Sequence, residues 1–262
     1  MINYCIILPP ILASGSTEYQ GCNSYSEYNY LQGGIVSWIK RRHLTIALNL
    51  GKNFFYNGCV IDFGCADGIF LPSLSVFFKS VVAIDNNEIF CVQSQRLVDV
   101  LKLHNVSVVN NCNLSINQLK ERIPDNNYDI IYLLEIIEHI GNDYSTMYED
   151  KSKFIKDIFS LIDDNGICII SVPKMVGLTY LIQYVGLKVF NLYVEKLSLK
   201  NLIKAALLSD THDLEKNWRP LYGHIGFNHI MFEKYLKDDF IIEKKVNDLF
   251  QVVYSIKKIK VV

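Results

Sequence analysis

Asp62 and the small-residue turn Gly64-Cys65-Ala66-Asp67-Gly68 are the first residues in the chain whose types and spacing suggest chemistry. Small side chains leave the backbone uncovered, so we expect a ligand to approach the peptide N–H groups at the start of the next helix, Ile69 to Phe78. The spacing G-x-A-x-G differs from the G-x-G-x-x-G of dinucleotide sites, and the Asp62 carboxylate would repel a phosphate and attract an ammonium. The pattern predicts a nucleotide-like cofactor with a cationic end, and the alternative is a purely structural glycine turn.

A second acid occupies the equivalent place on the next predicted strand. The run Ser80 to Asp85 is apolar until its last residue. A carboxylate at the carboxyl end of the strand after the glycine turn can accept hydrogen bonds from both ribose hydroxyls of an adenosine. Asp85 therefore supports an adenosine-containing cofactor without distinguishing among such cofactors.

Further along the chain, strands and helices alternate as expected for a parallel sheet. We expect a helix from Asn87 to Leu103 and another from Tyr148 to Ile162. The remaining predicted strands are Val106 to Val109, Asn127 to Leu134 and Ile167 to Val172, the last ended by Pro173. Upstream of them, residues 13 to 29 read as a loop and Tyr30 to Leu50 as a helix, with Tyr25, Tyr28 and Trp38 either closing over a substrate or packing the helix onto the sheet.

The end of the chain separates two kinds of doubly wound fold. Phe240 to Val246 and Leu249 to Ile256 are β-rich runs joined only by Asn247-Asp248. So short a link cannot make a parallel crossover and forces a hairpin. An antiparallel last strand on an otherwise parallel sheet disfavours the all-parallel sheet of the dehydrogenases.

Two motifs carry a resemblance to a known family. D-x-G-C-x-x-G, beginning at Asp62, and Y-D-I-I-Y-L-L-E-I-I-E-H-I, from Tyr128 to Ile140, resemble the first and fourth motifs of class I S-adenosylmethionine-dependent methyltransferases, and in particular those of the ubiquinone-biosynthesis type of O-methyltransferase. The resemblance covers about residues 30 to 173 and 222 to 258. It implies an α/β fold with a doubly wound, seven-stranded, mostly parallel Rossmann-like sheet, an antiparallel last strand and a helical insertion after the fifth strand.

The resemblance also implies which residues hold S-adenosylmethionine. The acid and glycine turn would hold its methionine end, Asp85 its ribose, and the residues after the third strand its adenine, where asparagine replaces the usual acid and can still accept the adenine amino group. The cofactor-binding residues predicted in this way are Asp62, Gly64, Cys65, Ala66, Gly68, Asp85, Asn86, Asn111, Cys112, Leu134 and Glu135.

Histidines near the predicted fourth strand and last helix are candidates for catalysis. Transfer of a methyl group to a poor nucleophile needs a base, and His139 follows the strand at the sheet edge where ligands bind. His224, in the turn before a predicted helix from Ile230 to Lys237, is the second candidate. The alternative for each is a histidine that only caps or packs its own segment.

A metal site is the alternative to metal-free catalysis. Glu135, Glu138 and His139 have the spacing to place three ligands near one helical turn, a set that suits a hard cation such as Mg²⁺. The string E-x-x-E-H resembles the magnesium-binding motif of small-RNA 2′-O-methyltransferases, in which a more distant histidine, here His224 or His229, completes the site. We expect a metal-free site.

Composition limits the class of protein and partner. Half of the 262 residues are apolar and the net charge is −1, so we expect one core, a single domain over residues 1–262, and no general attraction to nucleic acid. The seven cysteines include no C-x-x-C pair, and the Ile6 to Leu12 run lacks a basic leader and contains Pro9-Pro10. These features predict a cytoplasmic protein with reduced thiols.

The insertion at residues 174–221 is the part that could meet an apolar partner. Met175 to Tyr193 is almost wholly apolar, yet a single membrane crossing would separate strands of one sheet. We expect a helical lid, either packed on the domain or resting in a membrane interface through Leu178, Leu181, Ile182, Val185 and Phe190.

Together these observations predict an S-adenosylmethionine-dependent methyltransferase that acts on an oxygen of a small-molecule, saccharide or lipid-like acceptor. Two alternatives stay open. One is an RNA 2′-O-methyltransferase with a metal site, which the absence of a basic patch disfavours. The other is a non-catalytic protein of the same fold, which the run of Asp62, Gly64, Gly68, Asp85 and Glu135 disfavours.

Overall fold

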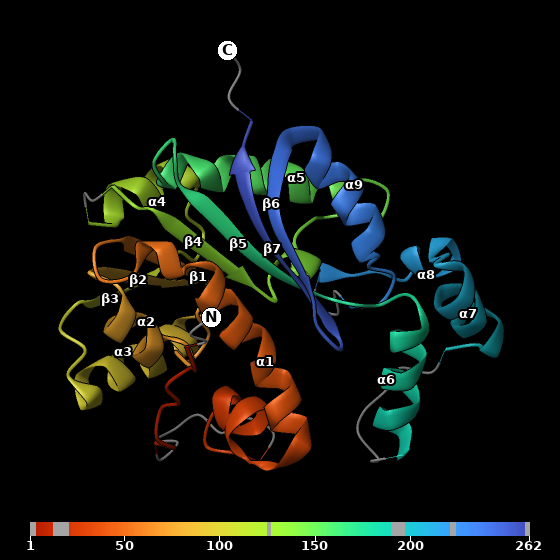
Figure 1. Ribbon diagram of the computed structural model, residues 1–262, viewed down its shortest axis with the longest axis horizontal. Coiled ribbons are helices and arrows are strands. Elements are labelled where there is room, and N and C mark those ends of the chain that lie inside the picture. The colour runs from red at the N-terminus through yellow and green to blue at the C-terminus, as the bar shows by residue number, and fades with distance from the viewer. Residues whose placement is uncertain (1–3, 13–20, 125–126, 190–196, 221–223, 260–262) are drawn as a thin grey trace.

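The computed structural model describes residues 4–12, 21–124, 127–189, 197–220 and 224–259. They contain a seven-stranded sheet in the order β3-β2-β1-β4-β5-β7-β6 (Figure 1). The strands are β1 Cys59–Phe63, β2 Ser80–Asp85, β3 Val106–Asn110, β4 Ile130–Leu134, β5 Ile167–Pro173, β6 Phe240–Asn247 and β7 Gln251–Lys258. The predicted sheet is confirmed.

The strand directions place the candidate residues that follow the parallel strands on one side of the sheet, at the carboxyl ends of these strands. Strands β1 to β5 run parallel, and β7 pairs antiparallel with β5, with Pro173 opposite Gln251. The hairpin of β6 and β7 is therefore confirmed, and its turn lies at the carboxyl ends of the parallel strands. The strand order reverses between β1 and β4, and ligands of open α/β sheets bind at the carboxyl side of such a switch point.

Helices cover both faces of the sheet (Figure 1). One face carries α1 Gly34–Leu50, α2 Leu71–Phe77 and α3 Glu88–Leu101, and the other carries α4 Ile116–Arg122, α5 Met147–Ile158 and α9 His229–Asp239. Every residue of β1, β2 after Ser80, and β5 is buried, which is why these strands read as continuous apolar runs instead of alternating ones.

The long helix expected from Tyr30 to Leu50 is interrupted. A single π-helical turn spans Glu27–Leu31, and α1 begins only at Gly34. Gly33 and Gly34 have φ of 81° and 73°, a left-handed conformation that glycine adopts without strain and that ends the first segment. The N-terminal segment therefore turns back toward the edge of the sheet before α1 starts.

Two further boundaries differ from the expected ones by three residues or more, and the others agree within two residues. The helix expected from Tyr148 to Ile162 ends as α5 at Ile158 and continues as the 3₁₀ turn Phe159–Leu161. Strand β4 begins at Ile130, three residues later than expected, and residues 125 and 126 lie outside the described part.

The insertion after β5 is helical, as predicted. It contains α6 Leu178–Val189, α7 Leu199–Ile203, the π-helical turn Lys204–Leu208 and α8 His212–Glu215, gathered beside the sheet (Figure 1). These elements share a small core of their own, formed by Tyr180, Tyr184, Leu202, Ala205 and Leu214. None of the helices in the described ranges combines the length and apolar character needed to cross a bilayer. Phe190 and residues 191–196 and 221 lie outside the described residues.

Candidate functional site

The glycine turn after β1 is shaped by its small residues. Gly64 has φ of 79°, and a Cβ at this position would lie 2.1 Å from the Ile136 side chain. Gly64 and Cys65 both donate their N–H groups to the Ile84 carbonyl, and Gly68 donates to Cys65. These three N–H groups are therefore used within the protein and are not free to bind a ligand. That a ligand approaches the N–H groups at the start of the next helix stays a prediction.

Asp62 lies next to this turn as an isolated acid. Its side chain is 4% exposed and takes part in none of the hydrogen bonds between described residues. Burial, and secondarily the Asp85 carboxylate, raise the pKa of Asp62 to about 7. A buried carboxylate without a cation is stabilised when a cationic group binds beside it. This environment fits the ammonium of the methionine end of the cofactor.

Asp85 links the glycine turn to the next strand. Its two carboxylate oxygens accept the N–H groups of Ala66 at 2.9 Å and Asn87 at 2.8 Å. A carboxylate has about four acceptor positions, so capacity for ribose hydroxyls remains. Asn86 follows it on the exposed side.

The end of β3 offers an amide where the adenine is expected. Asn111 Oδ1 is buried and has no hydrogen-bond partner among the described residues. An unpaired buried carbonyl is costly unless a ligand supplies a donor, and the adenine amino group is such a donor. Cys112 is exposed next to it. The structure thus places Asn111 in an environment that suits its predicted role.

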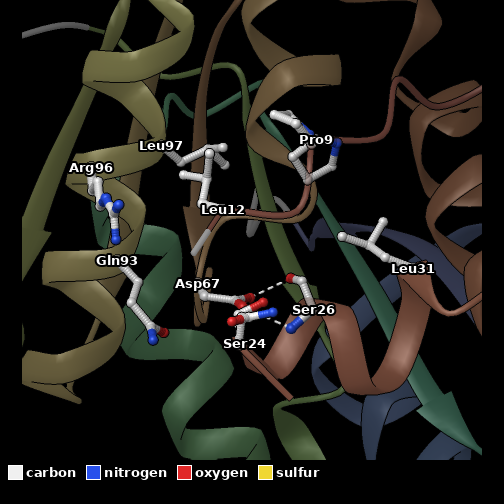
Figure 2. Close-up of a pocket in the computed structure, with 11 residues that line it drawn as sticks. Pro9, Leu12, Ser24, Ser26, Leu31, Asp67, Gln93, Arg96 and Leu97 are labelled. Atoms are coloured by element: carbon white, nitrogen blue, oxygen red, sulfur yellow. Dashed lines mark hydrogen bonds between the residues drawn. The ribbon is translucent and has the colours of Figure 1, made fainter. Parts of the chain in front are cut away.

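The N-terminal π-helical turn is held against the glycine turn. The Ser26 backbone N–H donates to Asp67 Oδ2 at 2.7 Å, and the Ser26 hydroxyl donates to Oδ1 (Figure 2). Both residues are buried, and burial raises the pKa of Asp67. Tyr25, the residue before Ser26, packs its ring on Phe90 at 5.6 Å. The N-terminal segment therefore covers the cofactor side of the sheet edge.

Glu135 ends β4 in an unusual conformation. Its φ is 58°, which is uncommon for a residue other than glycine and is typical of functional sites. Ser171 of β5 holds it there, because its Oγ accepts the Glu135 N–H at 3.1 Å and donates to Glu135 Oε1 at 3.0 Å. Burial, followed by the nearby Glu138, raises the pKa of Glu135 to about 8. Leu134, the preceding residue, is half-buried.

A cavity of about 530 Å³ opens beside Glu135. It lies between the N-terminal segment, α1, the insertion and the turn of the β6–β7 hairpin. Its walls include the aromatic side chains of Tyr25, Tyr30, Tyr180, Tyr184 and Phe250 and polar groups, among them Lys40, Glu135, His139, His224 and Asp248. A concave, mostly apolar site with a few converging polar groups is suited to a small acceptor.

The structure brings His139, His224 and Glu138 together. His139 Nδ1 lies 2.8 Å from the Pro220 carbonyl, which assigns the proton to Nδ1 and leaves Nε2 as an acceptor. Glu138 Oε1 lies 4.0 Å from His139 Nε2 and 3.8 Å from His224 Nδ1. Burial, and next the His139 ring, lower the pKa of His224 to about 4, whereas burial raises the pKa of Glu138 to about 8.

This group contains three of the ligands named for the alternative of a metal site. Glu138, His139 and His224 place their ligand atoms within 4.8 Å of one another, whereas Glu135 and His229 are not part of the group. Glu138 is fully buried, and neither of its carboxylate oxygens has a hydrogen-bond partner among the described residues. The residues fit a cation, but a set of two imidazoles and one carboxylate suits a borderline ion such as Zn²⁺ better than the predicted Mg²⁺.

The loop that carries Glu138 and His139 is supported from behind. The buried Lys151 of α5 donates to the carbonyls of Glu138, at 3.5 Å, and Ile140. Its Nζ lies 4.4 Å from the centre of the Trp218 ring, and the Trp218 indole also donates to the Glu138 carbonyl, at 3.0 Å. These contacts fix the 3₁₀ turn Ile137–His139, which replaces the helical turn expected from the spacing.

Several candidates lie elsewhere, and several site residues were not foreseen. Trp38 is 48% exposed and packs on Arg42, and Tyr28 contacts Lys40. Neither Ser171 nor the Lys151–Trp218 pair belongs to a motif in the sequence. Ser171 had one detectable signal, since it is a lone polar residue within an apolar strand.

Comparisons with known proteins identify the family. The family model described as a methyltransferase domain matches residues 36–224. A ubiquinone biosynthesis O-methyltransferase of Rickettsia bellii is 26% identical over 165 residues, 62% of this chain and 55% of the relative. The chain thus spans about half the length of that curated relative.

Solved structures share the fold. A SAM-dependent methyltransferase from Aquifex aeolicus is similar with a TM-score of 0.52 and 18% identity, covering 84% of this chain and 93% of its own. The N-methyltransferase NodS from Bradyrhizobium japonicum, in complex with S-adenosyl-L-homocysteine, is similar with a TM-score of 0.51 and 11% identity, covering 85% and 88%. Since the family model covers well over half of the chain and the sheet has the order and the antiparallel last strand described above, this protein belongs to the S-adenosylmethionine-dependent methyltransferases with the class I, Rossmann-like fold.

Proposed function

We propose that the protein transfers the methyl group of S-adenosylmethionine to a hydroxyl oxygen of an acceptor with an apolar body. The observation that carries the proposal is the cavity of about 530 Å³ that joins Glu135, at the cofactor side, to His139 and His224. The name of the Rickettsia bellii relative supports oxygen as the methyl acceptor.

In this mechanism the cofactor supplies an electrophilic methyl group on a sulfonium, and the protein aligns and deprotonates the nucleophile. Asp62 pairs with the cofactor ammonium, and Asp85 and Asn111 accept from its ribose and adenine. The acceptor enters the aromatic cavity with its hydroxyl toward His139. His139 Nε2 takes the hydroxyl proton, while the Pro220 carbonyl at Nδ1 keeps the imidazole in the required tautomer.

Labelled methyl transfer tests the proposal directly. Purified protein and methyl-labelled S-adenosylmethionine are incubated with cell extract, and products are separated into small molecules, lipids and RNA. We expect label in a small molecule or lipid. His139→Ala should lower turnover about 10²- to 10⁴-fold while the affinity for S-adenosylhomocysteine stays unchanged. Label in RNA, or no label in any fraction, would refute the proposal.

The buried Glu138 carboxylate supports a second role for the histidine group. We propose that Glu138, His139 and His224 hold a divalent cation, which when bound would lower the pKa of an acceptor hydroxyl. Metal analysis of the purified protein and calorimetry with Zn²⁺ and Mg²⁺ test this. Tight binding of Zn²⁺ that is lost in Glu138→Gln is expected. Full activity after exhaustive chelation would show that His139 acts without an ion.

The insertion favours a lipid-like acceptor. Along α6, Leu178, Ile182 and Val185 are 61%, 57% and 50% exposed and lie on one helical face. The next segments add an exposed set with similar spacing, Leu199, Ile203, Leu207 and Leu208. Leu181, by contrast, packs with Tyr180 and Tyr184 in the core of the insertion. We propose that these exposed faces rest on a membrane surface and that the adjoining cavity collects the acceptor there.

Sedimentation with liposomes tests this contact. The free energy would come from buried apolar area, so we expect binding to neutral and anionic lipid with little dependence on salt. The double variant Ile182→Asp, Val185→Asp should release the protein. Val92→Asp, Val100→Asp, at positions 64% and 53% exposed on α3, is the matched control and should not. Equal loss in both variants, or no sedimentation of the wild type, would refute the contact.

A further inference from the structure

Lys40 is a cation without a matching acid. Its Nζ donates to Asn29 Oδ1 at 2.7 Å and lies 5.7 Å from the centre of the Tyr28 ring. None of the ion pairs in the described part of the chain includes it, although Arg42, two residues later, pairs with Asp248 at 2.6 Å. Burial lowers the pKa of Lys40. A partly buried ammonium with only an amide and an aromatic ring beside it gains free energy when an anion binds.

Lys40 lies on the acceptor side of the site. It lines the same cavity as His139 and His224, whereas Asp62, Asp85 and the glycine turn do not line that cavity. The helix that carries Lys40, α1, packs against β5 and β7, which are on the far side of β4 from the cofactor-binding end of β2. Glu135, which is predicted to bind the cofactor, lines the cavity as well, so the position of Lys40 favours an anion on the acceptor without excluding the carboxylate of the cofactor.

Gln183 supplies a second polar group to the cavity. Gln183, on α6, lines the cavity, and its Oε1 is buried without a hydrogen bond to any described residue. A carbonyl oxygen in this state accepts a hydroxyl or N–H donor from a ligand. The cavity thus presents an ammonium and an amide oxygen among aromatic side chains. It is also lined by two acids, of which Asp248 is paired with Arg42 and Glu135 is hydrogen-bonded to Ser171.

From this arrangement we propose that the methyl acceptor carries a carboxylate that pairs with Lys40, with its apolar body against Tyr30, Tyr184 and Phe250 and a donor group at Gln183. This inference rests on the proposed function and adds the chemical class of the acceptor: a hydroxylated carboxylic acid with an apolar, preferably planar, body. The methionine carboxylate of the cofactor is the other possible source of the anion, and the experiment separates the two.

Calorimetry with a matched pair of probes tests the assignment. The protein is first titrated with S-adenosylhomocysteine and then, saturated with it, with phenylacetate or with phenylacetamide, which has nearly the same shape and no charge. The wild type should bind phenylacetate about 10- to 100-fold more tightly, the range expected for a hydrogen bond to a charged group. Lys40→Met should abolish this preference, and Lys40→Arg should restore part of it. Lys52→Met, outside the cavity, is the control.

Each outcome is decisive. Equal binding of both probes by the wild type, or binding of neither, overturns the inference. A loss of S-adenosylhomocysteine affinity in Lys40→Met, with the preference for phenylacetate retained, also overturns it, because the cofactor carboxylate would then be the partner. Failure of the wild type to bind S-adenosylhomocysteine at all would refute the proposed function itself, independently of Lys40.

Discussion

Replacing the buried Lys151 by methionine should change how the stability of the protein depends on pH. Lys151 is fully buried, and burial lowers its pKa from the ordinary 10.5 to about 7, against the favourable charges of Glu138 and Asp150. Such a lowering corresponds to about 5 kcal/mol by which folding disfavours the charged form. The methionine variant carries no charge at this position at any pH.

Whether the stability rises or falls with pH depends on which state, folded or unfolded, binds the Lys151 proton more strongly. Between pH 7 and 10.5 the unfolded chain keeps the Lys151 proton and the folded chain releases it, so the contribution of Lys151 to the stability of the wild type rises with pH over this range. The penalty is fully present below pH 7 and fades toward pH 10.5. From pH 7 to pH 9.5 the wild type should therefore gain about 3 kcal/mol relative to Lys151→Met. Loss of the lysine also raises the pKa of Glu138 further, which acts in the same direction.

Urea unfolding of both proteins at pH 7.0 and pH 9.5 measures this difference. At pH 9.5 the variant should be clearly less stable, because the carbonyls of Glu138 and Ile140 lose a donor without the compensation of removing a charge. Lys153→Met, on the same helix, provides the control and should follow the wild type. Parallel pH dependence in the wild type and the Lys151 variant would mean that Lys151 stays charged in the folded protein and would refute the argument.

Three other outcomes follow from the cofactor side. Asp62→Ala should weaken binding of S-adenosylmethionine by about 1.5 to 3 kcal/mol, roughly ten- to a hundredfold, and unchanged calorimetric affinity would contradict the assignment of the ammonium site. Because the pKa of Asp62 is raised to about 7, affinity in the wild type should fall about tenfold per pH unit below pH 7, whereas in Asp62→Asn it should not. Gly64→Ala should destabilise the protein by about 2 kcal/mol or more in thermal unfolding, since the added Cβ would lie 2.1 Å from Ile136 at a positive φ; a wild-type midpoint would disprove this reason for the glycine.

The sheet and the cofactor side could be predicted because their signals are local. The apolar runs indicate buried strands, and the two-residue link Asn247-Asp248 forces an antiparallel hairpin. The acids Asp62 and Asp85 mark the strand ends that face the cofactor side. The acceptor side could not, because its geometry depends on contacts between distant segments. The Trp218 indole reaches the Glu138 carbonyl 80 residues away, and no periodicity in the sequence encodes that contact.

The conformation of Glu135 could not be predicted for the same reason, because it depends on a contact with a distant segment. Spacing alone placed Glu135, Glu138 and His139 on one helical turn, but Glu135 adopts a left-handed φ that Ser171, 36 residues later, holds in place. The interruption before α1 was more accessible, since Gly33-Gly34 marks a break in the sequence. The apolar periodicity on both sides of the glycines nevertheless predicts one continuous helix.

The hydrogen bond from His139 to the Pro220 carbonyl joins the proposed base to the end of the insertion that lines the proposed acceptor cavity. Exchanging the insertion for that of another methyltransferase would therefore alter specificity and basicity together. A chimera that replaces residues 174–217 and keeps Trp218 to Pro220 would retain the carbonyl that sets the histidine tautomer and the indole that anchors its loop. Residues 174–217 could therefore be exchanged to change the acceptor, whereas Trp218 to Pro220 would have to be kept for the proposed role of His139.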